Sequence, residues 1–286
     1  MDARDTGSDQ ARLWNGDAGR AWVDLQESLD RLWKPFEETL AGAAPAGCRV
    51  LDVGCGTGAT TLAAARRAGG GATGIDISEP MLEAARTKAE RDGIAARFLC
   101  GNAQEYPFEA GTFDRILSRF GVMFFEDPVR AFANLRRAAA EGAVLVAIAW
   151  RGAEENPFMT VAERTAAPLL PDLPPREPDA PGQFAFADAE RVRGILERSG
   201  WVGIEIEPID IDCCLPEPEL VHYFTRLGPV GRVLDGVEAS KRAETIERVR
   251  AAFEPYVHGD EVRFLAACWM IRARTGAGEP VVSTVP

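Results

Sequence analysis

Two aspartates, one on each side of a glycine-rich turn, are the residues of this sequence that most clearly indicate a ligand-binding site. Asp52 lies two residues before the turn Gly54-Cys55-Gly56-Thr57-Gly58, and Asp76 ends the next apolar run, about twenty residues on. An apolar run, a glycine turn and a helix-like segment form the layout from which α/β folds build a nucleotide pocket at the carboxyl ends of their strands. Glycine suits such a turn because the backbone needs unusual dihedral angles and approaches the ligand closely. The pattern predicts an enzyme that uses a nucleotide-like cofactor.

The charge of Asp52 indicates which cofactor this is. A carboxylate at the mouth of the turn repels a pyrophosphate and attracts an ammonium or sulfonium group. A ligand that is cationic at one end and adenosine at the other is S-adenosylmethionine. Gly54, Gly56 and Ala59 also satisfy a looser dinucleotide pattern. An NAD(P)-dependent oxidoreductase is therefore an alternative, disfavoured by Asp52 and by the lack of any tyrosine followed by a lysine four residues later. A non-catalytic cofactor-binding protein is a second alternative.

Composition narrows the class of protein. The chain has 286 residues, of which 46% are hydrophobic, and its formal net charge is −12. It has no basic stripe of the kind that binds nucleic acid, so no nucleic-acid partner is expected. No apolar run approaches the length of a membrane span, and the polar, acidic N-terminus resembles no targeting peptide. We expect a cytoplasmic protein without a membrane partner, and the sequence leaves its oligomeric state open.

Strand-like and helix-like segments alternate regularly in the first half of the chain. Strands are predicted at 49–53, 72–76, 96–100, 113–118 and 143–150, with helices between most of them, including one capped by Ser78. The second half contains a proline-rich stretch at 151–187, a helix after Asp188, an edge-like strand at 204–211, two or three helices at 217–256 and a last strand at 262–271. This order predicts an α/β fold with a doubly wound, mostly parallel sheet.

The chain resembles the class I S-adenosylmethionine-dependent methyltransferases, in particular the group similar to ubiquinone and menaquinone biosynthesis enzymes. The resemblance is carried by Leu51–Gly58, Gly74–Ser78 with Met81, Gly101–Ala103 and Phe113–Phe120. It implies a seven-stranded sheet whose last strand is antiparallel, with a helical insertion that forms a lid. The expected parts are an N-terminal helical segment over the cofactor site (1–47), a cofactor-binding core (48–150), the completed sheet with its acceptor lid (151–275) and a disordered tail (276–286).

The resemblance assigns the methionine end of the cofactor to the glycine turn. Gly54 and Gly56 are expected to pass under the methionine moiety, with Asp52 balancing its ammonium group. Ser118, at the end of the fourth strand, is expected to offer its backbone carbonyl to the same ammonium. Trp14 and Trp22, in the segment before the core, are expected either to help close the site against water or only to dock that segment on the core.

The adenosine end is assigned to the second and third strands. Asp76 is expected to accept hydrogen bonds from both ribose hydroxyls, a task that suits a carboxylate. Because this places Asp76 in solvent when no ligand is bound, we expect Asp76→Ala to leave the stability of the free protein unchanged. Ile77 and Met81 are expected to sandwich the adenine, and Asn102, with Ala103 beside it, to accept from the adenine amino group.

The sequence supplies few residues for further chemistry. The six cysteines show no metal-ligand spacing, so no metal site is expected. His222 and His258 are lone histidines that suit surface or packing positions, and we assign no catalytic base. Methyl transfer from a sulfonium depends mainly on positioning the reactants and on excluding water. The lack of an assigned catalytic base is therefore compatible with a methyltransferase. Aromatic and apolar residues after the strand ends are candidates for the lining of a pocket for a small, partly apolar methyl acceptor: Phe120, Met123, Phe124, Phe125, Trp150 and Phe158. The alternative is that several of these aromatic residues belong to the core, and for Phe124 and Phe125 we favour that interpretation.

Overall fold

Parallel strands form one side of the sheet, and a pair of long antiparallel strands forms the other. The structure is a computed structural model that describes residues 9–176 and 180–276. Its strands lie in the order β3-β2-β1-β4-β5-β8-β6. Strands β3 to β5 pair in parallel, whereas β8 pairs antiparallel with both β5 and β6. Their bounds are Val50–Val53 (β1), Ala72–Asp76 (β2), Ala96–Cys100 (β3), Phe113–Arg119 (β4), Ala139–Trp150 (β5), Trp201–Pro216 (β6) and Glu261–Thr275 (β8).

This arrangement confirms the predicted doubly wound sheet and adds one short strand to it. Val257–His258 (β7) pairs with the start of β8, so the described residues form an eight-stranded sheet. Every residue of β1 and β2 is buried, because parallel strands are covered by helices on both faces. Strand β6 lies at the edge, as Pro208 within it predicts, and it is exposed at most positions.

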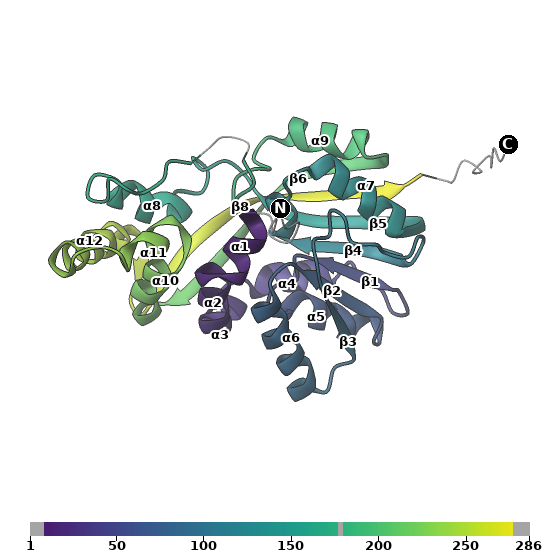
Figure 1. The fold of residues 1–286 in the computed structure, drawn as a ribbon, viewed down its shortest axis with the longest axis horizontal. Helices are drawn as coiled ribbons and strands as arrows, with labels where there is room; N and C mark the ends of the chain where they lie inside the picture. Colours follow the sequence, from purple (N-terminus) through teal and green to yellow (C-terminus); the bar gives the residue numbers. More distant parts are fainter. Residues whose placement is uncertain (1–8, 177–179, 277–286) are drawn as a thin grey trace, which may run out of the picture.

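Helices cover both faces of the sheet, and a further group gathers at one end (Figure 1). The N-terminal helices are α1 (Asp9–Asn15), α2 (Asp17–Asp24), α3 (Gln26–Leu32) and α4 (Lys34–Ala41). Those of the core are α5 (Ala59–Ala68), α6 (Glu79–Asp92), α7 (Pro128–Ala138) and α9 (Ala189–Arg198). The end group is α8 (Pro157–Ala166), α10 (Leu220–Arg226), α11 (Gly228–Leu234) and α12 (Ala239–Ala252), which contact one another. These last helices correspond to the insertion that the sequence predicts in the second half.

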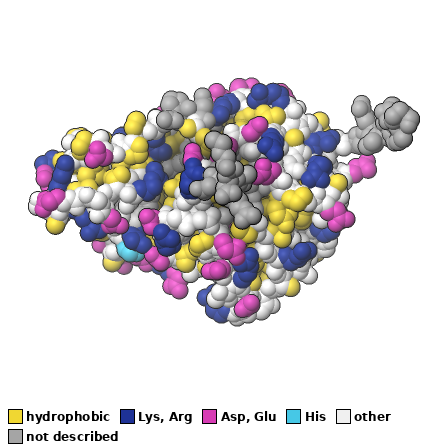
Figure 2. Space-filling view, in the orientation of Figure 1, with side chains coloured by type: hydrophobic (Ala, Val, Ile, Leu, Met, Phe, Trp, Pro, Cys, Tyr) yellow, Lys and Arg dark blue, Asp and Glu magenta, His cyan; other side chains and the backbone are white. Residues whose placement is uncertain are grey.

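The described surface mixes charges of both signs. Figure 2 shows lysine and arginine side chains scattered among aspartates and glutamates over the visible face. Within residues 9–176 and 180–276, no helix is both long and apolar enough to cross a lipid bilayer. Apart from Gly276, the tail expected to be disordered lies outside the described residues.

Candidate functional site

One large cavity runs from the glycine turn to the end group of helices. Its volume is about 990 Å³, at the upper end of the range for ligand pockets, so it has room for a cofactor and a second small molecule. Most of the residues assigned to the cofactor line it together: Trp14, Trp22, Gly54, Gly56, Asp76, Ile77, Met81, Asn102 and Ala103. Asp52 and Ser118 do not line it.

The glycine turn is shaped by its positive φ angles and by contacts that leave no space for a side chain at Gly54 or Gly58. Gly54 and Gly56 both have positive φ angles, 67° and 54°. A Cβ on Gly54 would lie 2.7 Å from the Cα of Gly121, which follows β4, so the two backbones are in direct contact. A Cβ on Gly58 would lie 2.8 Å from the Cβ of Ala85 on α6. The turn therefore presents bare backbone to the cavity, as a close-fitting ligand requires.

Asp76 holds this turn in place. One carboxylate oxygen, Oδ2, accepts the backbone N–H of Gly56 at 2.7 Å, and Oδ1 accepts the N–H of Ser78 at 2.9 Å. The residue is only 7% exposed, and burial raises the pKa of its carboxyl group, partly opposed by these two N–H groups. The expectation that Asp76 faces solvent in the free protein is therefore wrong. Its oxygens still have free lone pairs on the cavity side, so two ribose hydroxyls fit there.

Asp52 lies beneath the glycine turn rather than at its mouth. Its side chain is 1% exposed, and Oδ2 accepts the hydroxyl hydrogen of Thr61 on α5 at 2.6 Å. Oδ1 is buried without a hydrogen-bond partner. Burial raises the pKa of Asp52 to about 6, opposed by Thr61 and by the positive charge of Arg119. Asp52 can thus act on a bound cation through its electric field, but it makes no direct contact with the cavity.

The part of the cavity where the sequence predicts the adenosine is lined by residues at and after the ends of β2 and β3. Ile77 and Met81 lie on one wall, where a Cβ on Gly56 would come 3.8 Å from the Met81 sulfur. Asn102 also lines the cavity, and its side-chain oxygen accepts the N–H of Gln104 at 3.0 Å. The amide oxygen is therefore already engaged locally, although its second lone pair is available to a ligand.

The N-terminal segment is fastened to the loop that carries Asp76. Ser78 occupies the N-cap position of α6, but its hydroxyl donates to the carbonyl of Trp14 at 2.6 Å instead of capping the helix. Asn15 takes over that role, since its Oδ1 accepts the N–H of Glu79 at 3.0 Å while its amide donates to the carbonyl of Ile77 at 2.9 Å. Trp14 also contacts Trp22 edge to face, with ring centroids 6.2 Å apart. Both tryptophans thus dock the segment and line the cavity.

Arg119, Phe120 and Gly121, at and directly after the end of β4, line the cavity. Ser118 is buried, and its hydroxyl donates to the carbonyl of Val53 at 2.8 Å, behind the cavity wall. Phe120 has a φ of 65°, the one positive φ at a non-glycine position among the described residues. Such a conformation is costly for a bulky residue. It turns the ring onto Trp150, with centroids 4.8 Å apart and planes at 14°, and toward Trp33 of the N-terminal region.

The far half of the cavity is aromatic. All six candidate residues line the cavity, including Phe124 and Phe125, which we expected in the core and which pack against it only partly buried. Tyr223 and Phe224 of α10 and Phe253, directly after α12, join them. Burial raises the pKa of Tyr223 above its ordinary value, so its phenol stays protonated at neutral pH. His222 and His258 are exposed and do not line the cavity. The residues that sequence reasoning missed here lie in α10 and directly after α12, where their helical spacing indicated only a packed core.

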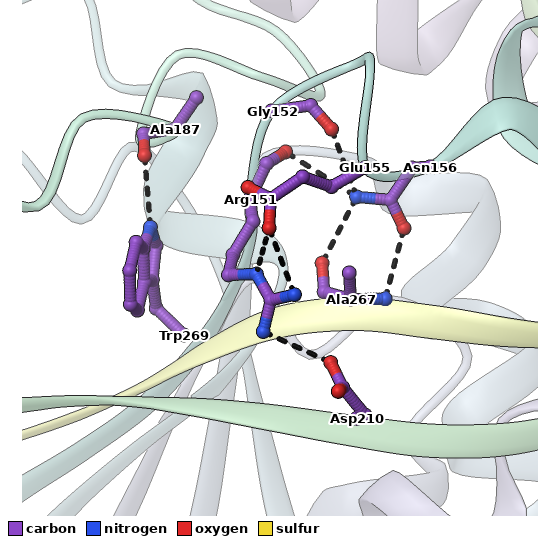
Figure 3. A network of polar contacts seen from close by, with 8 residues as sticks. All are labelled: Arg151, Gly152, Glu155, Asn156, Ala187, Asp210, Ala267 and Trp269. Atoms are coloured by element: carbon purple, nitrogen blue, oxygen red, sulfur yellow. Dashed lines mark hydrogen bonds and ion pairs between the residues drawn. The ribbon is translucent and has the colours of Figure 1, made fainter.

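A buried asparagine joins this far half to the sheet (Figure 3). The amide of Asn156 donates to the carbonyls of Gly152 at 3.1 Å and Ala267 at 3.0 Å, and its Oδ1 accepts the N–H of Ala267 at 2.9 Å. Nearby, Arg151 pairs with Asp210 of β6 at 2.9 Å. Asn156 immediately precedes α8, which carries Phe158, so these bonds fix where the lid helix leaves β5.

The described residues contain no cluster of side chains suited to bind a metal ion. No group of three or more histidine, cysteine, aspartate or glutamate side chains there could hold a metal ion. All six cysteines are free thiols.

Comparisons with known proteins agree with this geometry. Residues 50–142 match the family model described as a methyltransferase domain. The demethylmenaquinone methyltransferase of Thermus thermophilus is 36% identical over 126 residues, covering 44% of this chain and 57% of that protein. The ubiquinone/menaquinone biosynthesis C-methyltransferase UbiE of a Marinomonas species is 30% identical over 177 residues, covering 60% of this chain and 67% of that protein. The chain thus spans about three fifths to two thirds of these relatives.

The fold itself recurs in solved structures. The YcgJ protein of Bacillus subtilis superimposes with a TM-score of 0.56 at 19% identity, covering 86% of this chain and all of that one. At this identity the likeness concerns the fold alone.

Proposed function

The chain belongs to the class I S-adenosylmethionine-dependent methyltransferases, and on that premise we propose that it methylates a small, partly apolar molecule. The observation that carries this proposal is the continuity of the cavity from Asp76 and the glycine turn to the aromatic half. A cofactor at the turn and an acceptor among the aromatic residues would share one enclosed space. The quinone-related names of the relatives are consistent with such an acceptor.

The residues of the cofactor half fit S-adenosylmethionine. In our proposal Asp76 binds the ribose, and Ile77 and Met81 flank the adenine, with Asn102 and Ala103 at its edge. The bare backbone of Gly54 and Gly56 supports the methionine moiety. The field of the buried Asp52 and the backbone carbonyl of Ser118 stabilise the positive charge of its ammonium group. The bound cofactor supplies an activated methyl group.

The chain's own contribution is to hold the acceptor in line and to keep water out. In our proposal the stacked rings of Phe120 and Trp150 lie between the cofactor and the acceptor. Trp14 and Trp22 close the cofactor end through the N-terminal segment. Tyr223, kept protonated by its burial, can donate a hydrogen bond to a polar group of the acceptor, whereas it is poorly suited to remove a proton. We name no general base among the residues of the cavity.

We propose further that the second half of the chain decides the acceptor. Segments 151–187 and 212–256 supply Phe158, Tyr223, Phe224 and Phe253, whereas the cofactor residues all precede position 119. We also place the protein in the cytoplasm, where its free thiols would stay reduced.

Binding and transfer test this proposal separately. Calorimetry should show that the protein binds S-adenosylhomocysteine and has no measurable affinity for NAD(P). Methyl transfer from radiolabelled S-adenosylmethionine is then screened with phenols, quinols and aromatic amines. Phe224→Ala should change which acceptors react while leaving S-adenosylhomocysteine affinity within about three-fold of wild type. Binding of NAD in place of S-adenosylhomocysteine would overturn the cofactor assignment, and a Phe224→Ala acceptor range equal to that of wild type would overturn the lid assignment.

A further inference from the structure

A partly buried cation, Arg119, lines the cavity beside the glycine turn and has no ion-pair partner among the described residues. Arg119 ends β4 and forms part of the cavity wall. Its Nη1 atom is buried and has no hydrogen-bond partner, and no described residue forms an ion pair with its guanidinium group. Burial lowers the pKa of Arg119, yet arginine keeps its charge in proteins. An unpaired charge in such a place is expensive unless something else neutralises it.

The carboxylates whose charges act on Arg119 already have other polar partners. Asp30, Asp52 and Glu37 all act on it electrostatically. Asp30 pairs with Lys88, Asp52 accepts from Thr61, and Glu37 pairs with Lys34 at 2.5 Å. These acids form a negative surrounding that tolerates the cation, but they leave its donors free for an external anion.

The register of the sheet places this free cation at the cofactor end of the cavity. Asp52 on β1 is in register with Leu117 on β4, so Arg119 emerges beside Gly54, two residues further along each strand. Side chains two residues apart on a strand share a face, so Arg119 and Asp52 project from the same face of the sheet. Beyond Arg119, Gly121 and Gly54 are in backbone contact.

We propose that Arg119 binds the carboxylate of the amino-acid end of the cofactor. This inference rests on the proposed function, because it requires S-adenosylmethionine in the glycine turn. Arg119 and Asp52 then form a pair of opposite charges that matches the carboxylate and the ammonium group of one amino acid. A planar guanidinium group recognises a carboxylate through two parallel hydrogen bonds, which a lysine cannot reproduce.

Calorimetry with two nucleosides tests this assignment in the full chain. S-adenosylhomocysteine carries the amino-acid end, whereas 5′-methylthioadenosine lacks it. Arg119→Met should weaken S-adenosylhomocysteine binding about 10- to 100-fold and leave 5′-methylthioadenosine within about two-fold. Arg119→Lys should lose an intermediate amount, because it keeps the charge without the fork. The wild type should also bind decarboxylated S-adenosylmethionine more weakly than S-adenosylmethionine, and Arg119→Met should bind the two equally.

A structural role for Arg119 predicts a different set of results. Arg115 lies on the same strand outside the cavity, where it donates to the carbonyl of Ala43, so Arg115→Met is the matched control and should keep its S-adenosylhomocysteine affinity. Without ligand, Arg119→Met should unfold at the same temperature as wild type or higher, because it removes an unpaired, partly buried charge.

Equal losses for both nucleosides, or a lower unfolding temperature, would overturn the proposal. So would wild-type S-adenosylhomocysteine affinity in Arg119→Met combined with an altered KM for an acceptor, because the guanidinium group would then serve the acceptor. A wild-type protein that binds neither nucleoside would instead contradict the proposed function.

Discussion

Replacing Asp76 with alanine should damage both the free protein and its complex, for two separate physical reasons. In the free protein the carboxylate satisfies the backbone N–H groups of Gly56 and Ser78. Leaving a buried donor unsatisfied costs about 1–3 kcal/mol, so losing both partners should lower the free energy of unfolding by about 2–4 kcal/mol. The ribose hydroxyls then lose a charged partner as well. The loss of that partner should cost about 2–4 kcal/mol of binding free energy. Because each 1.4 kcal/mol changes an affinity about ten-fold, we expect S-adenosylhomocysteine to bind about 30- to 1,000-fold more weakly.

Two measurements separate these effects. Urea unfolding without ligand reports the loss of the two backbone contacts, and calorimetry at a temperature where the variant is folded reports the loss of affinity. Asp76→Asn keeps one acceptor oxygen and should lose about half as much stability. Unchanged stability in Asp76→Ala would show that the glycine turn is held by other contacts, and unchanged affinity would show that the ribose is bound elsewhere.

The remaining predictions concern three other positions. S-adenosylhomocysteine affinity should be constant from about pH 7 to 8, where the ligand's amino group is still charged, and fall as the pH drops below about 6, because protonation of Asp52 removes the negative charge that favours the ligand's ammonium group. Asp52→Asn should give a flat calorimetric profile from about pH 5 to 8. Gly19→Ala places a Cβ 1.9 Å from the Trp14 carbonyl oxygen, so stopped-flow measurements should show S-adenosylhomocysteine leaving about five-fold faster, whereas Gly194→Ala, with open space around it, should not change that rate. Asn156→Ala leaves both backbone groups of Ala267 without their side-chain partner, so the free energy of unfolding should fall by about 2–4 kcal/mol and hydrogen exchange in α8 should accelerate, with cofactor affinity unchanged. Equal exchange in α8 of Asn156→Ala and wild type would contradict the anchoring role.

The sequence predicts the parts of the site that depend on local pattern. Alternating apolar runs and glycine turns give the order of strands and helices, and with it the position of Asp76 at the end of β2. The antiparallel last strand came from the resemblance, because apolar runs do not record their direction. The two-residue strand β7 is too short to produce any periodicity.

The parts that the sequence could not predict depend on contacts between distant residues. The spacing of Asp52 from Gly54 is visible in the sequence, but its depth beneath the turn depends on Thr61 of α5. Asn15 meets Ile77 across 62 positions, and Asn156 meets Ala267 across 111. Phe120 adopts a left-handed backbone conformation that is unfavourable for an isolated phenylalanine, and in the fold its ring packs on Trp150, Phe36 and Trp33, which are distant in sequence.

The attachment of the N-terminal helices to the ribose-binding loop has a consequence for the speed of turnover. Trp14 and Asn15 bond to Ser78, Ile77 and Glu79, directly beside the carboxylate that would hold the ribose. A cofactor that leaves past this segment must first open those bonds, so contacts that shield the reaction would also delay the next cycle. A segment outside the cofactor-binding core would then set both how well the reaction is shielded from water and how fast the cofactor is exchanged. Sequence change there could alter the pace of the enzyme without touching its chemistry.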